Sequence, residues 1–236
     1  PIITPRFVPS CTGELMSGLG NLAEAYNVPV QSHLSENHGE IDWVAALHPE
    51  AANYTDVYYE HHLMGEVPTV MAHCIHLSDV EMDLMAETQT MVSHCPYSNV
   101  NLSSGIAPIR KLFERKIPIG LGSDISGGHI VSMAKVLTEA IGLSKMKWVE
   151  VDQTYAPLTL SEAFYMATKG GGKFFGKVGS FEKGCELDAL VIDDTMLFDP
   201  NERSLEERLE RWLYVGDDRH IIERYVAGKV APEPTN

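Results

Sequence analysis

Several short apolar runs in this chain end abruptly in polar residues that can bind a metal or move a proton. His33 ends VPVQSH with Glu36 on the loop behind it, His73 ends TVMAH, and Asp124 ends PIGLGSD. Turn or helix-start residues follow each run, as expected for parallel strands that deliver side chains to the mouth of an α/β barrel. The sequence therefore predicts an α/β fold containing a partial (β/α)8 TIM-like barrel, with a site at the carboxyl ends of its strands.

Strand and helix signals alternate along residues 1–175, which is typical of a parallel βα fold. The apolar runs predict five strands, at residues 2–7, 28–33, 69–74, 90–96 and 118–124. Helical spacing predicts helices at residues 13–26, 79–87, 106–116, 132–145 and 162–170, and two short ones between 41 and 63 around Pro49. Ser78 with Glu81 forms a capping-box signature, and Ser161 is predicted to cap the last helix. Five strands are fewer than the eight that close a barrel.

The pattern changes near Gly176. A turn and an alternating strand are predicted within residues 179–193, and a second strand with a Gly-Lys turn within residues 219–230. These segments predict a small β element outside the barrel. We therefore expect two regions: residues 1–175 as barrel, and residues 176–236 as β-sandwich strands with a C-terminal segment whose tail, 232–236, frays.

The net charge and the lengths of the apolar runs argue against some classes of binding partner. The formal net charge is -15, with no cluster of Lys and Arg, which argues against binding to nucleic acid or anionic lipid. The apolar runs are far shorter than the roughly 20 residues that cross a bilayer, and the start lacks a cationic segment followed by an apolar one. The four cysteines form no CxxC pair, so no structural zinc knuckle or redox motif is indicated. We expect a soluble, cytoplasmic protein without membrane contact.

The four strand-end residues suit metal-assisted hydrolysis. A metal held by His33 lowers the pKa of a bound water towards about 7, and Glu36 beside it can shuttle the proton. Asp124 supplies a hard oxygen ligand or accepts the proton, while His73 hydrogen-bonds the nucleophile or polarises the substrate. This is chemistry for hydrolysis or deamination.

Structural roles are the alternative for each residue taken singly. A strand-end His is more often a hydrogen-bonded structural residue, and Glu36 and Asp124 suit helix caps or first-turn acids equally well. Chance is a poor explanation for four such residues at successive strand ends. His94, in SHCPYSN, has the same placement, and either a chemical role or a role in orienting the following loop fits it.

QSHLSEN, MAHC, SHCPYSNVNLSSG and GLGSDISGG, in this order and spacing, resemble the second half of the barrel in the amidohydrolase superfamily. PRF near the start and YVGDDR near the end are similar to the guanine deaminases of that superfamily. The resemblance implies zinc, with iron as an alternative, and hydrolysis of guanine to xanthine and ammonia.

The resemblance also implies a role for each matching position. His33 is a zinc ligand, and Asp124 is both a ligand and the proton acceptor from the water. Glu36 protonates the purine ring nitrogen and passes a proton to the departing amine, and His73 hydrogen-bonds the nucleophile. Arg6 donates to an acceptor on the guanine edge while Phe7 packs on the ring; without the resemblance, a surface Arg and a core Phe are expected instead.

One part of the superfamily pattern is absent. The zinc site of these proteins also uses a His-x-His pair, and no HxH tripeptide occurs in this chain. His33 and Asp124 alone fall short of the three protein ligands usual in catalytic zinc sites. The expectation is therefore a carboxyl-terminal part of a longer enzyme, inactive alone and homodimeric when complete. Two rivals stay open: an amidohydrolase acting as a deaminase or chlorohydrolase on another heterocycle, and a non-catalytic scaffold built on a decayed barrel.

Overall fold

A computed structural model describes residues 1–232 of the chain, so part of the tail expected to fray, residues 233–236, lies outside it. The fold is α/β, as predicted, and is built on a parallel sheet with the order β1-β2-β3-β4. Its strands are β1 (Val30–Leu34), β2 (Thr69–His73), β3 (Met91–His94) and β4 (Ile119–Leu121). Within the described residues the sheet is open and does not close into a barrel.

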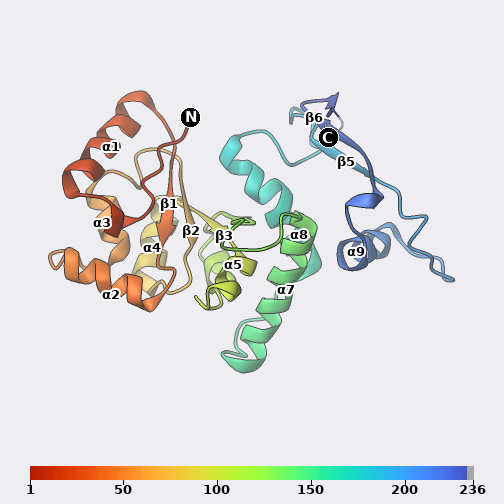
Figure 1. The fold of residues 1–236 in the computed structure, drawn as a ribbon, viewed down its shortest axis with the longest axis horizontal. Helices are drawn as coiled ribbons and strands as arrows, with labels where there is room; N and C mark the ends of the chain where they lie inside the picture. Colours follow the sequence, from red (N-terminus) through yellow and green to blue (C-terminus); the bar gives the residue numbers. More distant parts are fainter. Residues whose placement is uncertain (233–236) are drawn as a thin grey trace.

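Helices connect and cover these strands (Figure 1). The helical elements are η1 (Val8–Ser10), α1 (Gly13–Tyr26), α2 (His38–Leu47), α3 (Tyr54–Glu60), α4 (Asp79–Glu87), α5 (Pro96–Asn101), α6 (Ile109–Glu114), α7 (Met133–Glu150), α8 (Leu160–Tyr165), η2 (Met166–Gly170), η3 (Lys173–Phe175), α9 (Leu205–Val215) and η4 (Asp218–His220). The two helices expected around Pro49 are confirmed as α2 and α3. No helix among residues 1–232 is long and apolar enough to cross a membrane.

Capping residues set where the helices begin. The capping box predicted at α4 is confirmed: Ser78 accepts from the backbone N–H of Glu81, and the Glu81 carboxylate accepts from that of Ser78. The cap predicted at Ser161 is wrong, because Thr159 occupies the N-cap of α8 and Glu162 completes its capping box. A Thr with a Glu three residues later is the stronger signal, since both side chains then satisfy free N–H groups.

The strand expected at residues 2–7 is also wrong as a regular strand. Ile3 forms a single bridge to Val30, in which its N–H donates to Pro29 O and its carbonyl accepts from the Gln31 N–H, both at 2.9 Å. Pro5 has no N–H to donate, so the ladder cannot continue beside β1. The segment nevertheless runs along β1 and brings Arg6 next to the end of that strand.

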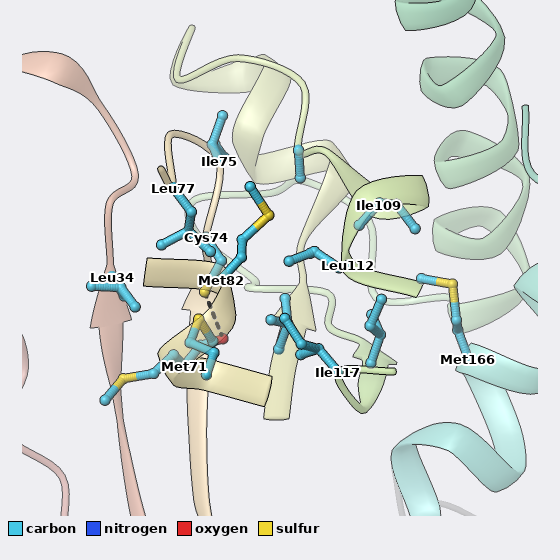
Figure 2. Close-up of a cluster of buried hydrophobic side chains, with 14 of the residues drawn as sticks. Leu34, Met71, Cys74, Ile75, Leu77, Met82, Ile109, Leu112, Ile117 and Met166 are labelled. Carbon is cyan, nitrogen blue, oxygen red and sulfur yellow. Dashed lines mark hydrogen bonds between the residues drawn. The ribbon is translucent and has the colours of Figure 1, made fainter. Parts of the chain in front are cut away.

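The hydrophobic core lies between one face of the parallel sheet and its helices. Figure 2 shows Leu34 and Met71 from the sheet beside Met82 of α4 and Leu112 of α6, all four almost fully buried. The Cys74 thiol, also in this cluster, donates to the Met71 carbonyl at 3.6 Å. Unbranched methionine side chains fill irregular spaces between strands and helices. The packing holds the strands as a fixed platform, from whose carboxyl ends the predicted site residues project.

The second β element comprises β5 (Ala189–Ile192), β6 (Ile221–Val226) and β7 (Lys229–Val230), which form an antiparallel sheet. The predicted Gly-Lys turn joins β6 to β7, where Ala227 and Gly228 have φ of 48° and 73°. Helix α9 between these strands was not predicted, although Ser204 and Glu207 form another capping box at its start. In Figure 1, α7 and α8 separate β5 and β6 from the parallel sheet.

Two glycines of α1 provide a matched test of its packing. An added Cβ at Gly20 would overlap the backbone carbonyl oxygen of His61, whereas one at Gly18 meets no atom within 4 Å. We expect Gly20→Ala to lower the unfolding free energy by about 1–3 kcal/mol. Gly18→Ala is expected to raise it by about 0.5–1 kcal/mol through helix propensity. Denaturant titration of both variants checks this, and stabilisation by Gly20→Ala would contradict the close contact.

Candidate active site

The structure brings all four strand-end residues together at the carboxyl edge of the parallel sheet. His73 Nε2 lies 3.8 Å from Glu36 Oε2 and 4.0 Å from Asp124 Oδ2. The rings of His33 and His73 are stacked, with 5.3 Å between centroids. His73 is 1% exposed on its side chain, against 17% for Glu36 and 32% for Asp124. The cluster therefore has a buried imidazole at its base and two carboxylates within reach of solvent.

The backbone is strained at this edge. His73 and Asp124 have φ of 70° and 43°, in the left-handed region that residues other than glycine seldom adopt. Such a conformation costs about 1–3 kcal/mol and concentrates at functional sites, where the surrounding structure holds it in place. Here the left-handed residues are the last residue of β2, His73, and Asp124, which lies on the loop three residues after β4.

Hydrogen bonds fix the orientation of His33. Its Nδ1–H donates to the backbone carbonyl of Arg6 at 2.6 Å, and the Tyr58 hydroxyl donates to its own carbonyl at 2.8 Å. With the proton on Nδ1, the lone pair of Nε2 is free to coordinate. A His that donates its second nitrogen to a backbone carbonyl is typical of metal ligands.

Glu36 is held from two sides by residues that sequence reasoning missed. Ser104 Oγ–H donates to Glu36 Oε1 at 3.0 Å, and the Glu36 backbone N–H donates to the Glu40 carboxylate at 2.9 Å. Glu40 is 7% exposed and also accepts from the Tyr54 hydroxyl at 2.7 Å, while burial raises the pKa of Tyr54 far above its usual range. The only sequence signal for Ser104 was the polar run SNVNLSSG.

Arg6 and Phe7 lie beside this cluster through the backbone of the opening segment. The Arg6 guanidinium lies 5.2 Å from the centre of the Phe7 ring, and Phe7 packs edge-on against Trp43 with 6.1 Å between centroids. Arg6 is exposed and Phe7 half-buried. The pair thus presents a cationic group and a flat ring next to His33.

His94 does not join the cluster. It is 1% exposed, its Nδ1 has no hydrogen-bond partner among residues 1–232, and it lines a hollow between α6 and α7. Burial, with a smaller contribution from the nearby His73, lowers the pKa of His94 to about 3, so its ring is neutral. No hydrogen bond joins its side chain to the loop that follows β3 in the described part of the chain, so an orienting role through such a bond is not supported.

The donor set fits part of a metal site. His33 offers a free Nε2 and Asp124 a carboxylate, which are the donor types that zinc takes in hydrolases. Among residues 1–232, no group of three or more His, Cys, Asp or Glu side chains is placed to hold a metal ion. His33 and Asp124 by themselves would be fewer than the three protein ligands usual in catalytic zinc sites.

Parallel strands that carry imidazole and carboxylate groups to one edge are an arrangement that metal-dependent hydrolases with α/β folds use. The chain belongs to the amidohydrolase family, whose model matches residues 1–231.

Comparison with individual proteins shows that the chain is similar to guanine deaminases within this family. The chain is 44% identical over 235 residues to guanine deaminase of Dictyostelium discoideum, covering 97% of this chain and 52% of that protein. It is 38% identical over 240 residues to guanine deaminase of Escherichia coli, covering 98% and 53%. A crystal structure of guanine deaminase from C. acetobutylicum with bound guanine superposes with a TM-score of 0.95 at 55% identity, covering 98% of this chain and 55% of that one. The chain spans about half the length of these relatives.

Proposed function

We propose that this chain provides the downstream half of a guanine deaminase, which hydrolyses guanine to xanthine and ammonia. The observation that carries the proposal is the placement of His73 Nε2 within 4.0 Å of both the Glu36 and Asp124 carboxylates, at the ends of three parallel strands. The similarity to guanine deaminases over nearly the whole chain supports guanine as the substrate.

His33 and Asp124 would hold the metal from this half, and the missing ligands would come from a His-x-His pair upstream. Zinc is the metal we propose, with iron as the alternative. When bound, the metal would lower the pKa of a water molecule and so supply a good nucleophile near neutral pH.

The protein side chains then transfer the protons that the reaction requires. Asp124 accepts one from the attacking water, and Nε2 of His73 hydrogen-bonds the attacking oxygen. Glu36 protonates the ring nitrogen next to the amino-bearing carbon and later passes a proton to the departing amine. The C–N bond breaks as the new C–O bond becomes the carbonyl of xanthine, and ammonia leaves. General acid–base groups placed in this way contribute about 10²–10⁴-fold to rate.

Arg6 and Phe7 would bind the substrate. A guanidinium donates to acceptors on the purine edge, and an aromatic ring packs against the flat purine. Their placement beside His33 supports this role.

The four parallel strands would be the second half of a (β/α)8 barrel that the upstream half completes. Residues 1–175 would then form the barrel part and residues 176–236 part of a β-sandwich. We further propose that the complete enzyme is a cytoplasmic homodimer.

Ammonia release from guanine, adenosine derivatives and triazines by the complete protein tests the substrate. We expect guanine to be favoured by at least about 10²-fold in kcat/KM, because buried polar groups left unpaired by the wrong heterocycle cost binding energy. A higher kcat/KM for a triazine or an adenosine derivative would contradict guanine as the substrate and would instead support a deaminase or chlorohydrolase acting on another heterocycle. Absence of both turnover and stoichiometric metal would favour the non-catalytic scaffold.

A further inference from the structure

Helix α5 and the loop after it contact three parts of the candidate active site. Asn99 Oδ1 accepts a hydrogen bond from His73 Nδ1 at 2.9 Å, and Ser104 Oγ–H donates to Glu36 Oε1 at 3.0 Å. Asn101 Nδ2 donates to the Gly127 carbonyl at 2.7 Å, on the loop that carries Asp124. One short segment, residues 99–104, therefore contacts each loop that bears a proton-transfer group.

The backbone of this segment joins its contacts into one unit. The Asn99 carbonyl accepts from the Ser104 N–H at 2.8 Å, and the Ser104 carbonyl accepts from His76 Nε2–H at 2.8 Å. Asn99 is fully buried and Ser104 is 6% exposed. A backbone hydrogen bond thus ties the two residues directly to each other.

The space around Gly127 shows how closely the segment approaches the Asp124 loop. A Cβ at this position would lie 2.5 Å from Ser98 Oγ of α5 and 2.6 Å from Asp124 Oδ2. Only glycine leaves room for the helix and the carboxylate to sit side by side.

Each hydrogen bond has a chemical consequence for the residue that it reaches. By accepting from Nδ1, Asn99 keeps a proton on that nitrogen, so His73 presents Nε2 to the two carboxylates in either ionisation state. Ser104 is the one side chain within residues 1–232 that hydrogen-bonds the Glu36 carboxylate, and it restricts the rotation of that group. A proton-transfer group displaced by about 1 Å loses about 10²-fold in rate.

A contribution to the stability of the fold does not explain why an amide side chain occupies position 99. Its Nδ2 is buried and has no hydrogen-bond partner among the described residues. A buried donor without a partner destabilises the fold, so the useful part of this side chain is the oxygen that faces His73.

We propose that Asn99 and Ser104 are positioning residues, which hold His73 and Glu36 in the arrangement that proton transfer requires. This inference rests on the proposed deaminase function. It adds that the geometry of two proton-transfer groups from separate strands is set by one helix and its loop, rather than by each strand end alone.

Ser104→Ala in the complete protein tests the proposal, with Ser103→Ala as the matched control. Ser103 is the exposed neighbour, and its side chain makes no hydrogen bond within residues 1–232. We expect Ser104→Ala to lower kcat by about 10–10²-fold, with KM for guanine, metal content and Tm unchanged. Ser103→Ala is expected to keep the wild-type kcat. Wild-type kcat in Ser104→Ala, or an equal loss in both variants, would overturn the positioning role.

A second measurement needs no turnover and so separates this inference from the proposed function. Long-range ¹H–¹⁵N spectra of the imidazoles report which nitrogen of a neutral ring carries the proton. In the wild type we expect His73 protonated on Nδ1, and in Asn99→Leu a mixture of tautomers. An unchanged His73 signature in Asn99→Leu would refute the role of Asn99, whatever the substrate proves to be. Failure of the wild type to deaminate guanine while the tautomer shifts would refute only the proposed function.

Discussion

Glu36→Gln is expected to keep the metal content of the complete protein while lowering kcat for guanine by about 10²–10⁴-fold, the range that a positioned acid–base group contributes. The amide has nearly the shape of the carboxylate, and its oxygen can still accept from Ser104 Oγ. It cannot take up a proton and deliver it to the purine. The variant therefore removes the proton transfer and leaves the cluster assembled.

Metal analysis and steady-state kinetics on the same preparation check this result. Glu24→Gln is the control, because Glu24 is an exposed acid of α1 whose side chain makes no hydrogen bond or ion pair within residues 1–232. Unaltered turnover in Glu36→Gln would remove this carboxylate from the mechanism. Loss of metal together with activity would instead make Glu36 part of the ligand set.

His33→Ala is expected to lose metal and activity together. The His33 ring is oriented for coordination by its 2.6 Å hydrogen bond to the Arg6 carbonyl, which leaves its Nε2 lone pair free. Loss of a partner that only orients a ligand costs about 10–100-fold in metal affinity, so loss of the ligand itself should cost more.

The matched control is His62→Ala. His62 is exposed, and the one polar contact of its side chain within residues 1–232 is a distance of 3.8 Å from Nδ1 to Glu66 Oε1. It should bind metal and turn over guanine like the wild type. A His33→Ala protein that retains stoichiometric metal would show that the metal is held elsewhere.

The strand ends could be predicted from the sequence because local patterning sets them. An apolar run that stops at His33, His73 or Asp124 marks both the end of a buried strand and the edge where parallel neighbours end. That the three ends meet follows from parallel pairing alone, since β1, β2, β3 and β4 lie side by side in chain order.

The features of the fold and site that the sequence did not predict depend on contacts between distant segments or on competing sequence signals. Ser104 and Glu36 are 68 residues apart, and no local pattern pairs them. The opening strand looked regular because its apolar residues outweighed Pro5, which interrupts the ladder. Helix α9 carried the same capping signature as α4, but the charged residues of LEERLER hid its apolar stripe. His94 shared the strand-end placement of the site residues, yet it is buried and lines a hollow between α6 and α7.

Anomalous diffraction at the zinc absorption edge, on crystals of the complete protein, tests the central claim most directly. The account predicts one strong peak within about 2.0–2.2 Å of both His33 Nε2 and an Asp124 carboxylate oxygen, with Glu36 and His73 flanking it. A peak at any other position, or crystals of active enzyme in which Glu36, His73 and Asp124 lie apart from one another, would contradict it.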